Sequence, residues 1–96
     1  METFNEDLNV AVITTKYIFK NGMPILHAYH HDDGFWEFVG DQKIEDEKEY
    51  MLVALEEILE IDSSLHYLAA LLPGMGAHRK SKNDEWAISV NRNEDD

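Results

Sequence analysis

The sequence predicts an α+β fold, in which an antiparallel β-sheet of about four to five strands carries one main α-helix and a second short helix on one face. Three observations favour this class. Short segments rich in β-branched and aromatic residues lie at both ends of the chain, turn dipeptides separate several of them, and one central segment has apolar residues at helical spacing. The expected element order is β-β-β-α-α-β-β, and a chain of 96 residues has room for a single core.

The first expected strand covers residues 10–15, where β-branched side chains are concentrated. Residues 16–20 either extend this strand or form one helical turn, because so short a segment has no decisive periodicity. The dipeptide Asn21-Gly22 predicts a turn. A second strand is then expected over residues 25–31, which brings the chain back beside the first.

A tight hairpin turn is expected next, at Asp33 and Gly34. Residues 35–39 form the returning strand. Side chains alternate between the two faces of a strand, so Trp36 and Phe38 share one face. We expect this face to lie against the core.

The central segment predicts the main helix, over residues 46–61. Asp46 and Glu49 have the spacing of a capping box. The apolar residues that recur at helical spacing are Tyr50, Met51, Ala54, Leu55, Ile58, Leu59 and Ile61. A second helix, α or 3₁₀, is expected over residues 65–72, before Pro73-Gly74.

Two further strands are expected near the end of the chain, over residues 74–78 and 86–90. The expected domain therefore spans residues 9–90. Residues 1–8 are expected to be a flexible N-terminus, and residues 91–96 a disordered acidic tail.

Composition narrows the class of function. Twenty acidic residues against eight lysines and arginines give a net charge of −12, which repels nucleic acids and anionic membranes. The absence of cysteine excludes disulfides and thiol chemistry. The N-terminus is polar and acidic, and no segment is apolar enough to span a bilayer, so we expect a cytoplasmic protein. The sequence leaves open whether it is a monomer or a homodimer.

The segment 27–33 contains the candidate metal ligands His27, His30, His31 and Asp32. On a strand, His27 and His31 would share a face at a separation of about 13 Å, with His30 on the other face. We therefore expect neither a metal nor another cofactor. With no nucleophile motif and no phosphate loop in the sequence, we also expect a protein that is not an enzyme. A domain that binds a small ligand or a divalent metal at residues 27–33 is the alternative.

Acidic residues are concentrated in the middle of the chain. Residues 32–62 contain twelve of them against two lysines, a net charge of −10. We expect this segment to recruit a basic protein partner, because complementary charge speeds association and selects partners. The candidate binding residues are Glu45, Glu49, Glu56, Glu57 and Glu60.

The chain also resembles a family of small bacterial domains of unknown function that is related to the immunity proteins of polymorphic toxin systems. The resemblance spans residues 12–86. The segments that carry it are residues 13–18, 24–26, 30–38, 55–65, 72–74 with Ala77 and Arg79, and 84–86. Together with the concentration of acidic residues, it favours a protein-binding module, in its narrowest form an immunity protein that neutralises a basic toxin domain.

Two of the residues in these segments, Arg79 and Trp86, are candidates for the binding surface. Arginine and tryptophan are enriched at interface hot spots. The alternative for Arg79 is a structural ion pair with one of the many carboxylates.

Overall fold

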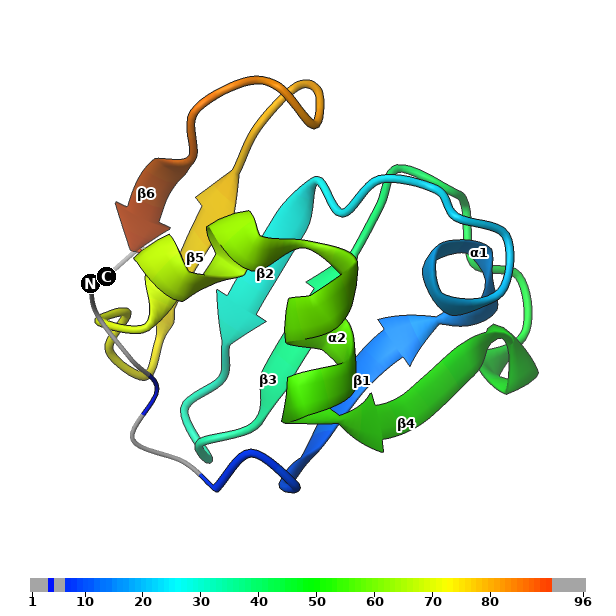
Figure 1. Cartoon of the computed structure of the whole chain (residues 1–96), viewed down its shortest axis with the longest axis horizontal. Helices are drawn as coiled ribbons and strands as arrows, with labels where there is room; N and C mark the ends of the chain where they lie inside the picture. The colour runs from blue at the N-terminus through cyan, green and yellow to red at the C-terminus, as the bar shows by residue number, and fades with distance from the viewer. Residues whose placement is uncertain (1–3, 5–6, 91–96) are drawn as a thin grey trace, which may run out of the picture.

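The computed structural model describes residue 4 and residues 7–90, where six strands form one sheet in the order β4-β1-β3-β2-β5-β6 (Figure 1). The strands are β1 (Ala11–Thr15), β2 (His27–His30), β3 (Trp36–Val39), β4 (Tyr50–Ala54), β5 (Met75–His78) and β6 (Ala87–Val90). The α+β class is confirmed. The expected sheet was wrong in two respects, because the sheet has six strands and because β1 runs parallel to β3.

The parallel pair arises from the connection after β1. Thr15 caps a single helical turn, α1 (Lys16–Phe19), through a hydrogen bond from the Ile18 amide to its Oγ1 atom at 3.4 Å. Ile18 is buried, which anchors this turn in the core. The chain then forms the hairpin of β2 and β3, and β3 is inserted between β2 and β1.

The expected helix over residues 46–61 is wrong in its first half. Asp46 does cap a turn, but this turn is the short 3₁₀ helix η1 (Glu47–Glu49). The next five residues form β4, which pairs with β1 along its whole length. Within residues 46–61 only α2 (Leu55–Ile61) is an α-helix, and the observed order is β1, α1, β2, β3, η1, β4, α2, η2, β5, β6. Along β4, Met51 and Val53 are more buried than Tyr50 and Leu52, which is the alternation expected of a strand. All of these residues are apolar, so the same segment also fits the helical stripe.

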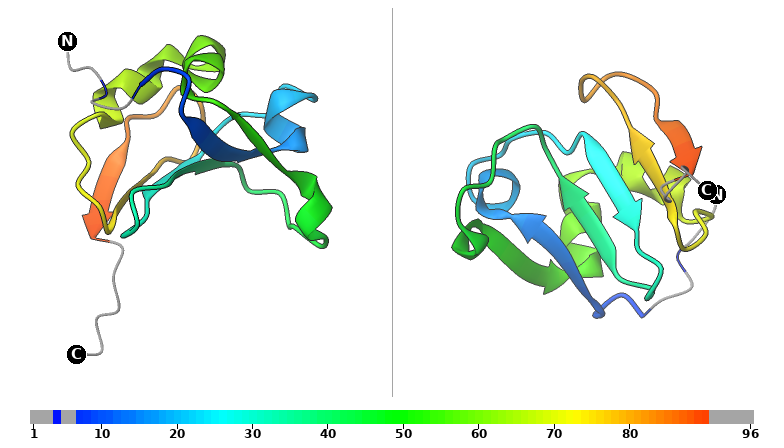
Figure 2. Two further views of the ribbon diagram at one scale, coloured as in Figure 1. Left: turned by 90° about the horizontal axis from the view of Figure 1, so that it is seen from below. Right: turned by 180° about the vertical axis from the view of Figure 1, so that it is seen from behind.

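The second expected helix is the 3₁₀ helix η2 (Ser63–Leu68), so it begins and ends earlier than residues 65–72. Figure 2 shows α2 and η2 on the same side of the sheet, while the view from behind looks onto the strands. We call the opposite side of the sheet the open face, because none of the described helices lies over its strands. The described part of the chain contains no helix of the length and apolar character that crossing a membrane requires.

The core lies between the sheet and these two helices. Trp36 and Phe38 are 2% and 0% exposed, which confirms the expected inward face of β3. The expected turn is also present, with Gly34 at a φ of 93°. Within the segment expected to be flexible, Phe4 is buried, and its ring lies edge-on to Trp36 at 5.1 Å. The expected acidic tail, residues 91–96, lies outside the described residues.

Candidate functional site: the open face of the sheet

The structure divides the candidate acidic residues between two places. Glu45 and Glu49 precede β4, whereas Glu56, Glu57 and Glu60 follow it on α2. A strand of five residues extends about 17 Å, so these two groups lie at opposite ends of β4. The five candidate carboxylates therefore form two separate groups and not one surface along a single helix.

Two of these five carboxylates have local structural partners. Glu57 accepts a hydrogen bond from the Ala54 amide at 2.8 Å, which caps α2. Glu49 accepts one from the Tyr17 hydroxyl at 2.9 Å. This hydrogen bond, together with burial and the negative charge nearby, raises the pKa of Tyr17.

Arg79 fills a structural position. Its side chain is 1% exposed, and its guanidinium group pairs with the carboxylate of Asp62. It also donates hydrogen bonds to the Ile25 carbonyl at 3.0 Å and to the Lys82 carbonyl at 3.1 Å. These contacts link β5 and the loop that follows it to the start of η2.

Trp86 and Ser64 complete this buried cluster. The Arg79 guanidinium lies 4.2 Å from the centre of the Trp86 ring, and the indole nitrogen donates to the Ser64 hydroxyl at 3.2 Å. Burial alone would raise the pKa of Asp62, but hydrogen bonds from Ser64 and Arg79 outweigh it and lower that pKa. Arg79 therefore forms the structural ion pair that was the alternative to a binding role, and Trp86 is half-buried against it.

The histidines of segment 27–33 point to different sides of the sheet. His30 is buried on the helix side, where it stacks on Trp36 at 3.9 Å and donates from Nδ1 to the Leu71 carbonyl at 2.7 Å. His31 instead pairs with Glu37 at 2.7 Å. Across residues 4 and 7–90, no group of three or more histidine, aspartate or glutamate side chains is placed to hold a metal ion.

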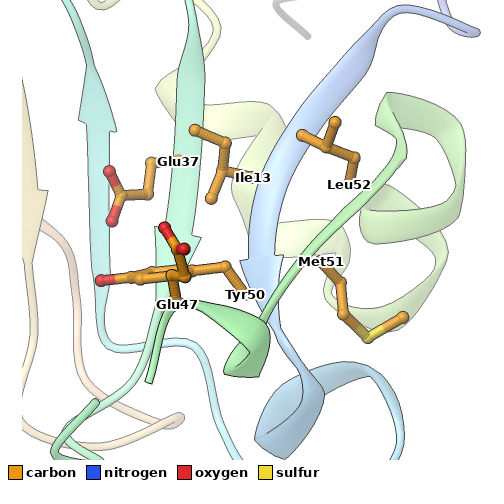
Figure 3. Close-up of a pocket in the computed structure, with 6 residues that line it drawn as sticks. All are labelled: Ile13, Glu37, Glu47, Tyr50, Met51 and Leu52. Carbon is orange, nitrogen blue, oxygen red and sulfur yellow. The ribbon is translucent and has the colours of Figure 1, made fainter. Parts of the chain in front are cut away.

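One half of the open face forms an apolar groove with an acidic border. Ile13 of β1 lies opposite Leu52 of β4 on one side and Glu37 of β3 on the other. Figure 3 shows these side chains beside Tyr50 and Glu47, with the carboxylates of Glu37 and Glu47 at the same end. The groove has a volume of about 390 Å³. We call it the β4 groove.

The side chains of β4 explain why this groove exists. Leu52 is 65% exposed and Tyr50 is 41% exposed, although both are large apolar residues. Met51 lies between them in the sequence, points the other way in Figure 3 and packs against the core. Strand alternation therefore places Tyr50 and Leu52 on the face without helices.

The other half of the open face is rich in imidazole and phenol rings. Tyr29 lies between His27, whose ring centre is 6.5 Å away, and His31, at 6.1 Å. His78 of β5 approaches the same tyrosine ring at 5.5 Å. Burial, and then the charge of Glu37, raises the pKa of Tyr29.

Comparisons with protein-family models, with curated proteins and with solved structures find no match to this chain. The residues of the open face are therefore the basis from which a function is inferred.

Sequence reasoning missed most of this face. It assigned Tyr50 to the buried stripe of a helix, and it did not consider Glu37, Glu47, Leu52 or His78 as site residues. The available signal was the unbroken run of five apolar residues at 50–54, which is equally compatible with a strand.

Proposed function

We propose that this protein is a non-enzymatic binding module that docks a basic protein partner in the β4 groove. An immunity protein that neutralises a basic toxin domain is the narrowest form of this function. The observation that carries the proposal is the exposure of Leu52 and Tyr50 on a sheet face that no described helix covers. Exposed apolar side chains gathered at one place are typical of interaction sites.

Charge supports a basic partner. The groove is bordered by Glu37 and Glu47, and the chain as a whole carries a net charge of −12. An apolar centre with a charged rim is the usual anatomy of a protein–protein interface. The rim carboxylates would accelerate association with a basic surface, and salt would screen this effect.

Two charge reversals of equal size test the location of the site. Glu47→Lys changes an exposed carboxylate at the groove, and Glu60→Lys changes an exposed carboxylate on α2. Each variant serves as immobilised bait in a lysate of the native host, and the bound proteins are identified by mass spectrometry. We expect one basic protein that the wild type and Glu60→Lys retain, that Glu47→Lys loses, and that salt releases.

Leu52→Ser is a second test that leaves the charge unchanged. It removes the most exposed apolar side chain of the groove, so it should reduce capture of the same protein. Equal retention by Glu47→Lys and Leu52→Ser would contradict the proposed site. Capture of no protein above the empty-matrix control would contradict the proposed function.

A further inference from the structure

A second groove lies on the other half of the open face, beside the loop between β5 and β6. Its volume is about 850 Å³. The side chains that line it include the imidazoles of His27 and His78, the carboxylates of Asp41, Asp84 and Glu85, and the ammonium group of Lys80. Neither the fold nor the proposed partner site accounts for this combination of groups.

The two imidazoles share one proton. The Nδ1 atoms of His27 and His78 are 2.9 Å apart, and Nε2 of His27 is 2.6 Å from Oδ1 of Asp41. An ionised carboxylate only accepts hydrogen bonds, so Nε2 of His27 carries its proton and donates it to Asp41. Between the Nδ1 atoms there is space for one proton, and the ring that does not carry it presents its lone pair.

This arrangement matches a pair of nitrogen ligands. Two ligands in cis positions on a square-planar or octahedral ion, with bonds of about 2.0 Å, are about 2.8 Å apart, whereas a tetrahedral ion separates them by about 3.3 Å. The observed separation of 2.9 Å is that of a hydrogen bond between the two rings, and it is also compatible with the first value. We propose that His27 and His78 bind one Ni²⁺ or Cu²⁺ ion through their Nδ1 atoms.

Binding requires little change in protonation. When both rings are neutral, the shared proton moves from Nδ1 to Nε2 of His78, and both Nδ1 lone pairs become available to the ion. Small rotations of both rings would direct the lone pairs to a point on the groove side.

Asp41 acts as a positioning residue in this site. A metal-binding histidine usually donates its other ring nitrogen to a carboxylate, which fixes the tautomer and raises the basicity of the ligand. The hydrogen bond from His27 to Asp41 already has this form. Water, or a carboxylate of Asp84 or Glu85 after a side-chain movement, would complete the coordination.

The test is a titration of the tag-free protein with Ni²⁺ by isothermal calorimetry near neutral pH, with Mg²⁺ as the comparison ion. We expect one Ni²⁺ per chain and no response to Mg²⁺, which prefers oxygen ligands. His78→Ala should weaken Ni²⁺ binding at least tenfold, and Asp41→Asn should weaken it about tenfold. The matched control is His31→Ala, which removes another histidine of the open face. This variant should bind Ni²⁺ as tightly as the wild type does.

A second measurement uses only the wild-type protein, so it does not depend on whether the variants fold. Cu²⁺, which is paramagnetic in both geometries, should broaden the imidazole NMR signals of His27 and His78 first and leave those of His66 sharp. The inference is overturned if Ni²⁺ does not bind at millimolar concentration, if His31→Ala weakens binding as much as His78→Ala, or if the broadening centres on another histidine. Loss of partner capture at the β4 groove would leave these outcomes unaffected, because the two sites have no ligand in common.

Discussion

Replacing Arg79 with methionine removes the cation of a buried ion pair but keeps the aliphatic bulk of the side chain. The change leaves the Asp62 carboxylate buried without its partner, and Asp62 is only 8% exposed. It also removes the donors to the carbonyls of Ile25 and Lys82 and the contact with the Trp86 ring. Breaking one side of a buried pair costs about 3–5 kcal/mol.

That loss is large for a domain of this size. Folded domains are stable by about 5–15 kcal/mol, so Arg79→Met should place the protein near its unfolding threshold. A loss of 1 kcal/mol lowers the melting temperature of a 60–100-residue domain by about 4–8 °C, which predicts a fall of at least about 12 °C. Urea unfolding followed by tryptophan fluorescence measures the free energy directly.

Two further variants isolate the physical cause. Lys80→Met removes the neighbouring charge from an exposed side chain and should change stability by less than about 0.5 kcal/mol. Asp62→Asn in the Arg79→Met background removes the unpaired charge and should restore part of the loss. A loss below 1 kcal/mol for Arg79→Met, or no recovery in the double variant, would refute the assignment of Arg79 as a buried structural link.

Three other predictions concern the core, the hairpin and the pH dependence of stability. Phe38→Ala empties a fully buried site and should cost about 3–5 kcal/mol in urea unfolding, a value that collapse of the cavity would reduce. Gly34→Ala meets no atom within 4 Å but places a side chain at a φ of 93°, so it should cost about 1 kcal/mol through backbone strain alone; a neutral result in thermal melts would contradict this. Acidification should lower the free energy of unfolding in two steps, because the pKa values of His78 and Asp62 are both lower in the folded protein and the unfolded chain therefore binds each proton at a higher pH. The step below the ordinary histidine pKa of 6.5 should disappear in His78→Gln. The step below the ordinary aspartate pKa of 3.8 should remain in that variant.

The predictable parts of the fold are those fixed by neighbouring residues. The turn at Gly34 and the inward face of Trp36 and Phe38 follow from turn chemistry and from alternation along one strand. The cap at Asp46 was also predictable, although the helix that it begins is one 3₁₀ turn.

The rest depends on pairing between distant segments. Residues 50–54 are an unbroken apolar run that fits a helix or a strand, and the choice is made by five paired positions with β1, about forty residues away in the chain. The parallel pairing of β1 with β3 is equally non-local. No local pattern contains this information.

The same limit applies to the site. His27 and His78 are 51 residues apart in sequence, and only the pairing of β2 with β5 brings them opposite each other. Leu52 and Tyr50 become surface residues only because β4 is a strand at the edge of the sheet. Carboxylate-rich composition predicted a basic partner, but it could not predict which face meets that partner.

The central claim is that the partner binds the open face at the β4 groove. The most direct measurement is methyl cross-saturation by NMR, from the captured partner to the isotope-labelled protein. The account predicts that saturation reaches the methyl groups of Ile13 and Leu52, which lie in the groove, and does not reach Ile61, which is exposed on α2. Saturation of Ile61 with no effect on Ile13 and Leu52 would place the partner on the helix side and contradict the account.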